Sequence, residues 1–143
     1  MTIQTLPDGL LKEKLKKFVY NTIGCCKEVH DEKGPGLTEY VYQECLEIAL
    51  SQKGIRFEKE YSFHPTFRGI ELKSFLRVDF MVEDKLFLEC KAIERISNYE
   101  RIQLTNYMRN AGVRIGILMN FYPLKYECER YYYDPEDNTI SFF

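Results

Sequence analysis

Several features that mark common classes of protein are missing from this sequence. No apolar run approaches the ~18 residues that a membrane-spanning helix needs, and residues 1–7 lack the basic and then apolar pattern of a signal peptide. No Cys-x-x-Cys motif occurs, the five cysteines are an odd number, and the two histidines, His30 and His64, stand far apart. These absences argue against a membrane protein, a disulfide framework and a zinc site. We therefore expect a cytoplasmic protein.

An excess of positive charge is missing too, because the formal net charge at pH 7 is −2. Binding to nucleic acid by bulk attraction is not expected, and any such role needs a local basic surface or phosphates bridged by metal ions. What is present is the composition of a globular protein, with 45% hydrophobic and 29% charged residues. The 143 residues are enough for a real hydrophobic core, and we expect a single domain over residues 1–143.

The most informative stretch is residues 77–91, whose pattern predicts two strands joined by a short polar turn. Side chains alternate between the two faces of a strand, so the length of the turn decides which residues share a face. A three-residue turn pairs Val82 with Leu86, Met81 with Phe87 and Asp79 with Glu89. Lys91 then lies one step along, and Val78 and Phe80 take the opposite face. A two-residue turn would place the two carboxylates on opposite faces.

Asp79 and Glu89 are not expected on an ordinary wet surface. Met81 and Phe87 share their face, so both faces of the hairpin are largely apolar, and such a sheet is covered on both sides. Two adjacent buried carboxylates repel each other and lose hydration unless a cation or protons compensate. We therefore predict that Asp79, Glu89 and Lys91 surround a divalent metal ion. The alternative is that the same three residues form a structural ion-pair cluster.

The remaining pattern predicts an α/β fold. Apolar spacing predicts helices over residues 7–30, 38–54 and 97–111, and alternation predicts strands over residues 55–63, 70–82, 86–91, 114–119, 125–133 and 139–143. Lys59 breaks the alternation of the first strand. The strand at 114–119 follows a helix, as in a crossover unit, so we expect it to lie parallel to the Glu89 strand. The order is an α-β-β-β-α-β core with an extra N-terminal helix and a C-terminal β-hairpin, a mixed sheet flanked by helices.

Polar residues on two of these helices are further candidates. Glu39 shares one face of the second helix with three apolar residues, Tyr42, Leu46 and Leu50. Two interpretations of Glu39 remain open: it belongs to the acidic site, or it favours the positive end of the helix dipole. Gln103 and Tyr107 are one turn apart on the third helix and share a stripe.

This order of parts resembles the PD-(D/E)XK nuclease superfamily, which has the restriction-endonuclease-like fold. A closer resemblance is to the GxxExxY family of small bacterial proteins, because Gly36, Glu39 and Tyr42 match its naming motif. Further matching blocks are residues 77–79, 82–85, 89–92, 103–107 and 116–121. The resemblance covers residues 34–121, and the order and spacing of the blocks carry it.

The resemblance implies a metal-dependent nuclease that hydrolyses phosphodiester bonds. Asp79, Glu89 and Glu39 would bind Mg²⁺ or Mn²⁺, the ions that hard carboxylate oxygens select. Lys91 would orient or activate the attacking water. Gln103 would support the site or touch the substrate. The predicted substrate-binding residues are Gln103, Tyr107 and Tyr42.

The implied substrate is nucleic acid, with DNA favoured. The chain has no obvious extra domain to grip DNA, so a homodimer or a protein partner is also an expectation. The alternative function is a catalytically inactive descendant that uses the same fold to bind nucleic acid or a protein partner.

Overall fold

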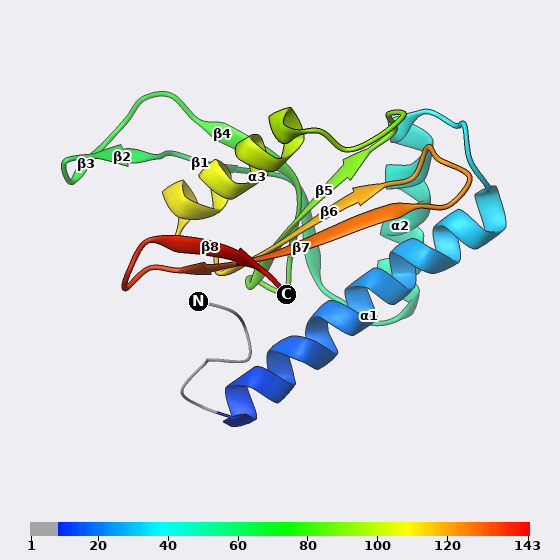
Figure 1. The fold of residues 1–143 in the computed structure, drawn as a ribbon, viewed down its shortest axis with the longest axis horizontal. Helices are drawn as coiled ribbons and strands as arrows, with labels where there is room; N and C mark the ends of the chain where they lie inside the picture. The colour runs from blue at the N-terminus through cyan, green and yellow to red at the C-terminus, as the bar shows by residue number, and fades with distance from the viewer. Residues whose placement is uncertain (1–8) are drawn as a thin grey trace.

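The computed structural model describes the backbone of residues 9–143 and the side chains of residues 15–143. These residues form an α/β fold with three helices and a mixed six-stranded sheet (Figure 1). The helices are α1 (Gly9–Lys33), α2 (Glu39–Gln52) and α3 (Asn98–Ala111). The strands of the sheet are β1 (Phe57–Phe63), β4 (Leu76–Val82), β5 (Leu86–Lys91), β6 (Ile115–Asn120), β7 (Glu127–Asp134) and β8 (Thr139–Phe142). Two short strands, β2 (Thr66–Phe67) and β3 (Ile70–Glu71), form a separate ribbon.

The topology confirms the predicted fold class. The strand order is β1-β4-β5-β6-β7-β8, and the core follows the chain as α2, β1, β4, β5, α3 and β6. The β5–β6 pair is parallel, as predicted from the crossover, and the other neighbouring strands are antiparallel. One prediction is wrong: residues 70–71 do not begin the strand that leads to Asp79 but belong to the β2–β3 ribbon, and β4 begins at Leu76.

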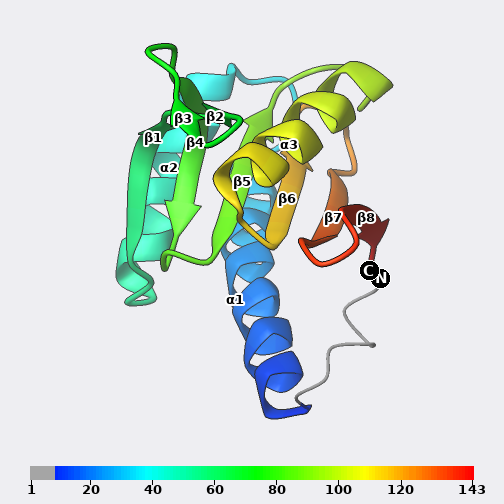
Figure 2. The same cartoon turned by 90° about the vertical axis from the view of Figure 1, so that its left-hand side faces the viewer.

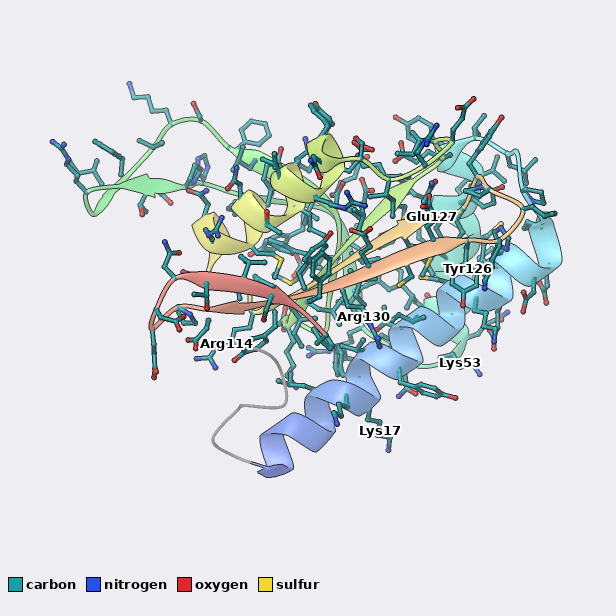
Figure 3. All side chains as sticks on the ribbon, in the orientation of Figure 1. Lys17, Lys53, Arg114, Tyr126, Glu127 and Arg130 are labelled. Carbon is teal, nitrogen blue, oxygen red and sulfur yellow. The ribbon has the colours of Figure 1, made fainter. Side chains whose placement is uncertain are left out.

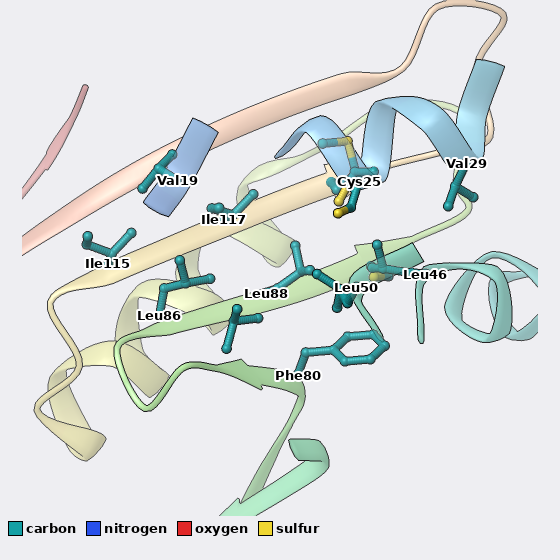
Figure 4. Packing of buried hydrophobic residues seen from close by; sticks show 14 of the residues in the cluster. Val19, Cys25, Val29, Leu46, Leu50, Phe80, Leu86, Leu88, Ile115 and Ile117 are labelled. Carbon is teal, nitrogen blue, oxygen red and sulfur yellow. The ribbon is translucent and has the colours of Figure 1, made fainter. Parts of the chain in front are cut away.

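The helices cover both faces of the sheet, as the doubly apolar hairpin predicted. Helices α1 and α2 lie on one face and α3 lies on the other (Figure 2). Figure 4 shows the first core, where side chains of α1 and α2 meet Phe80, Leu86 and Leu88 of the hairpin. The second core joins Phe87 to Leu104 and Met108 of α3. Among the described residues, no helix is both long and apolar enough to cross a membrane.

The β4–β5 hairpin has the predicted odd-numbered turn. The ladder pairs Val82 with Leu86, Met81 with Phe87 and Phe80 with Leu88. Residues 83–85 form the three-residue connection, in which Glu83 and Asp84 have positive φ angles of 52° and 59°. The predicted pair of Asp79 with Glu89 is not part of this ladder, which ends at Phe80 and Leu88, but the two residues lie next to each other because the Asp79 N–H donates to Glu89 Oε1.

Along β1 and β4, the side chains that point to one face of the sheet change to the other face at Glu60 and Asp79. Two residues of β1 face α2, since Phe57 packs on Phe80 and Lys59 donates a hydrogen bond to Glu47, whereas Tyr61 and Phe63 both contact Phe87 on the α3 side. Regular alternation would place all four on one face. Between them, Glu60 has a φ angle of 54°, and the β1–β4 ladder skips Glu60 and Asp79. The alternation of faces is therefore broken at Glu60, an exchange that the sequence pattern, interrupted only by the polar Lys59, did not predict.

The exchange also overturns one predicted neighbour of Asp79. Val78 packs in the α3 core, whereas Phe80 packs in the α1–α2 core, so the prediction that they share a face is wrong. The two paired strands share the irregularity: the left-handed backbone of Glu60, which costs an ordinary side chain roughly 1–2 kcal/mol, interrupts β1, and the ladder skips Asp79 on β4 at the same level. Asp79 therefore has no ladder partner on either neighbouring strand, β1 or β5.

Gly116 on β6 allows α3 to pack closely on the sheet. A Cβ atom at this position would clash with Met108 Sδ and lie 3.3 Å from Leu104 Cγ, both in buried side chains of α3. We expect Gly116→Val to lower the free energy of unfolding by ~1–3 kcal/mol, because overpacking forces buried side chains or the helix to shift. Urea unfolding measures the change.

Gly24 on α1 provides the control for this substitution. A Cβ atom there would meet nothing within 4 Å. Gly24→Ala should therefore raise the free energy of unfolding by ~0.5–1 kcal/mol, the helix preference of alanine over glycine. An unchanged unfolding midpoint for Gly116→Val would contradict the close packing of α3.

Candidate active site

Asp79 and Glu89 join β4 to β5 where the regular ladder ends. The last regular pair is Phe80 with Leu88. Beyond it, Glu89 Oε1 accepts the backbone N–H of Asp79 (2.9 Å), and Asp79 Oδ2 accepts the backbone N–H of Cys90 (2.8 Å). The two carboxylates therefore replace ladder bonds with bonds from their own side chains. In each carboxylate, one oxygen accepts a hydrogen bond from a backbone N–H, and the second oxygen is left for a cation.

Lys91 and Glu39 extend this pair. Lys91 Nζ lies 3.6 Å from Glu89 Oε2, and both side chains are largely buried, with 22% and 7% of their surfaces exposed. Glu39, the first residue of α2, lines the same shallow hollow of about 550 Å³ as Lys91 and Tyr122. The structure thus places Asp79, Glu89 and Lys91, the predicted core of the site, next to one another on β4 and β5, with Glu39 of α2 near Lys91, and their catalytic roles stay predictions.

The electrostatics of the four groups are coupled. Burial, followed by the charge of Asp79, raises the pKa of Glu89 from its ordinary value of 4.5 to about 7. Burial also raises the pKa of Asp79 and of Glu39, and Lys91 offsets only part of each shift. Burial disfavours the charged form of Lys91, but the three carboxylates outweigh it and raise the pKa of this amine. One lysine does not neutralise three partly buried carboxylates, so a further cation or bound protons compensate the remaining charge.

The donor set fits a hard divalent ion only in part. Asp79 and Glu89 offer carboxylate oxygens, the ligands that Mg²⁺ and Mn²⁺ prefer, from adjacent strands. Within residues 15–143, however, no group of three or more histidine, cysteine, aspartate or glutamate side chains is placed to hold one metal ion. The predicted ligand set of Asp79, Glu89 and Glu39 is therefore not assembled as three ligands. Two carboxylates meet, and the third, Glu39, lines the same hollow as Lys91.

The three fixed residues of the Gly36-x-x-Glu39-x-x-Tyr42 motif have distinct structural roles. Gly36 has a φ angle of 81°, which glycine adopts readily. Tyr42 donates a hydrogen bond to the Gly34 carbonyl (2.7 Å), accepts one from the Leu37 N–H (3.0 Å), and is fully buried. Tyr42 therefore holds the loop that leads into Glu39. The prediction that Tyr42 contacts substrate is wrong, because its surface is buried.

The other two residues predicted to support the site lie on α3. Tyr107 is half-buried, and its ring packs edge-on against Phe63 at a centroid distance of 6.1 Å. Gln103 is also half-buried, and in the described part of the chain no hydrogen bond joins it to Asp79, Glu89 or Lys91. The structure therefore places Tyr107 in the aromatic packing beneath α3 and leaves the role of Gln103 as a prediction.

Sequence analysis missed Asn120, which holds the loop after Lys91. Asn120 pairs with Lys91 in the β5–β6 ladder and is fully buried. Its Nδ2 donates to the Ile93 carbonyl (2.9 Å) and to Glu127 (2.9 Å), while its Oδ1 accepts the Ile93 N–H (3.1 Å). Glu127, labelled at the start of β7 in Figure 3, also accepts the Ile96 N–H. A polar residue that ends an otherwise apolar buried strand was the signal for this role.

The fold and the acidic hairpin at its centre define a restriction-endonuclease-like α/β protein. The sequence profile of the PD-(D/E)XK nuclease superfamily matches residues 16–131, and the chain belongs to this superfamily. Searches of the curated proteins and of the solved structures found no match. Membership suggests a nuclease, with nucleic acid as the general substrate and divalent metal ions as the typical cofactor of the superfamily.

Proposed function

We propose that the protein is a Mg²⁺- or Mn²⁺-dependent nuclease of the GxxExxY type, which hydrolyses phosphodiester bonds of nucleic acid, with DNA the favoured substrate. The observation that carries the proposal is the cluster of Asp79, Glu89 and Lys91. Two carboxylates with raised pKa values and one lysine meet where a strand ladder ends, in a chain that belongs to the PD-(D/E)XK nuclease superfamily. A structural ion-pair cluster would need no third, uncompensated carboxylate such as Glu39 beside it.

Each residue has a role that its position supports. Asp79 and Glu89 would hold the metal ion, because each has one carboxylate oxygen that accepts no backbone N–H. A bound Mg²⁺ or Mn²⁺ supplies positive charge to the phosphate and makes water easier to deprotonate. Lys91 keeps its proton at neutral pH because the carboxylates raise its pKa, so it orients water and offsets negative charge as a donor. Glu39 completes the acidic cluster through the ion or a water molecule, and Gln103 supports the site.

A cleavage panel tests the proposal. Labelled single- and double-stranded DNA and RNA are incubated with the protein and Mg²⁺, Mn²⁺ or EDTA. Cleavage that needs either metal and disappears when Lys91 is replaced by alanine would support the nuclease. Absence of metal-dependent cleavage on all four substrates would favour the alternative, an inactive member of the fold that binds nucleic acid or a protein partner.

A further inference from the structure

The β2–β3 ribbon and its flanks, residues 64–77, form an arm that stands clear of the rest of the molecule (Figures 1 and 3). The arm is a defined hairpin. Its tip is a two-residue turn at Arg68 and Gly69, with φ angles of 52° and 77°. Its base is closed by the Leu72 N–H, which donates to the Pro65 carbonyl (2.9 Å). The core fold needs no such insertion between β1 and β4, so the arm calls for its own explanation.

The arm exposes large apolar side chains. Phe67, Ile70 and Phe75 expose 60%, 70% and 59% of their surfaces. Phe67 and Ile70 are cross-strand partners, so they lie side by side on one face of the ribbon. Phe75 has only an edge contact with His64, at a centroid distance of 6.2 Å. Both phenylalanine rings therefore offer surface to a ligand.

The charges of the arm suit an anionic ligand. Residues 64–77 contain three positive side chains, Arg68, Lys73 and Arg77, and one negative, Glu71, in a chain whose net charge is −2. All three cations are exposed, and none takes part in an ion pair within residues 15–143. The Arg68 guanidinium lies 4.8 Å from the centroid of the Phe67 ring. Aromatic rings and these cations therefore occur on the same short segment.

The arm is rooted beside the candidate active site. Arg77 is on β4, two residues before Asp79. Phe63, which leads into the arm, contacts Phe87 on β5, the strand that also carries Glu89. It also contacts Tyr107 of α3. A polymer that lies along the arm would therefore continue toward the two carboxylates.

We propose that the arm binds a single-stranded stretch of the nucleic-acid substrate. Unpaired bases stack on Phe67 and Phe75, and phosphates contact Arg68, Lys73 and Arg77. Stacking needs exposed base faces, which a duplex hides and a single strand presents. This inference deepens the proposed nuclease function and rests on it for the identity of the polymer.

Binding without cleavage tests the arm. The parent and the variant Phe67→Ser/Phe75→Ser are each titrated, in EDTA, into a labelled DNA single strand of about 20 nucleotides and into its duplex. Fluorescence anisotropy of the DNA reports binding. The double variant should bind the single strand at least about tenfold more weakly, and the duplex with little change. The control Tyr20→Ser/Phe142→Ser removes two other exposed aromatic residues, on α1 and on β8 at the opposite edge of the sheet, and should bind like the parent.

The charged residues give a second measurement. Arg68→Gln/Lys73→Gln should reduce the dependence of the affinity on salt, because fewer phosphate counterions are released on binding. All variants change exposed residues, and thermal melts confirm that they fold.

Two outcomes would overturn the arm proposal: no binding of the single strand by the parent, or equal single-strand affinity in the phenylalanine variant. If equal affinity came with a changed oligomeric state of that variant, the arm would be an interface between copies of the chain. These results are separate from the cleavage panel. A parent that binds through the arm but never cleaves would contradict the nuclease and leave the arm in place.

Discussion

Replacing Lys91 with methionine is expected to reduce metal-dependent cleavage by a factor of about 100 or more, the loss typical when one charged donor of a transition state is removed. Methionine keeps the length of the partly buried stem and removes only the amine. Lys91 Nζ is 3.6 Å from Glu89 and shares a hollow with Glu39, so no other described cation stands as close to both carboxylates. The cleavage rate under single-turnover conditions measures the effect.

The same variant separates the role of Lys91 from that of the metal ligands. Asp79 and Glu89 keep their backbone hydrogen bonds, which do not involve Lys91. The loss of the amine leaves more uncompensated negative charge, so Mg²⁺ should raise the melting temperature of Lys91→Met at least as much as that of the parent. Lys91→Met should therefore lose cleavage activity but keep metal binding.

Lys53→Met is the matched control, because Lys53 is an exposed lysine whose ion-pair partner is Glu28, with 56% and 53% of the side chains exposed. It should retain the parent's cleavage rate. If Lys91→Met cleaved as fast as Lys53→Met, the assigned role of Lys91 would be wrong, even if the protein proved to be a nuclease.

The central hairpin could be predicted from sequence because its information is local. A polar turn of odd length between apolar strands places Asp79 and Glu89 together, and the register follows from side-chain alternation. Helix α3 was also predictable at both ends, since Ser97 and Glu100 form a capping box and Gly112 ends the helix in the left-handed conformation.

The exchange of faces at Glu60 could not be predicted in the same way. Nothing marks a glutamate for a positive φ angle, and only the packing of β1 and β4 against both cores imposes it. Asn120 was missed for a related reason. Three of its hydrogen bonds reach partners 27 and 7 residues away, which a pattern of spacing does not reveal. The hairpin, which could be predicted, carries the chemical groups of the site, whereas Glu60 and Asn120, which could not, help to position them.

Replacing Glu89 with glutamine is expected to stabilise the metal-free protein while abolishing cleavage. Ionised Glu89 is buried next to Asp79, and its pKa is raised from 4.5 to about 7. A shift of this size corresponds to ~3 kcal/mol of unfavourable free energy once the group is ionised. Glutamine keeps an oxygen for the Asp79 N–H but carries no charge. We expect the free energy of unfolding at pH 8 to rise by ~1–3 kcal/mol, less where the lost contact with Lys91 offsets the gain.

The stabilisation expected for Glu89→Gln depends on pH, and its direction follows from the pKa of Glu89. Because the pKa of Glu89 is higher in the folded protein than in the unfolded chain, the folded protein binds more protons between pH 4.5 and about 7. The parent's free energy of unfolding therefore falls as the pH rises through this window. Glu89→Gln lacks this contribution, so the two proteins should differ least near pH 4 and most near pH 8. Glu44→Gln, an exposed change on α2, should follow the parent.

Metal binding should reverse the order of stability at high pH. Mg²⁺ is expected to raise the melting temperature of the parent at pH 8, because the ion compensates the charge that burial makes unfavourable. It should raise that of Glu89→Gln much less, because an amide is a weaker ligand than a carboxylate. A structural ion-pair cluster predicts the opposite: Glu89→Gln would be destabilised at every pH above 5, and Mg²⁺ would affect neither protein. Urea unfolding from pH 4 to 8, with Mg²⁺ or EDTA, decides between the two accounts even if the nucleic-acid substrate is never found.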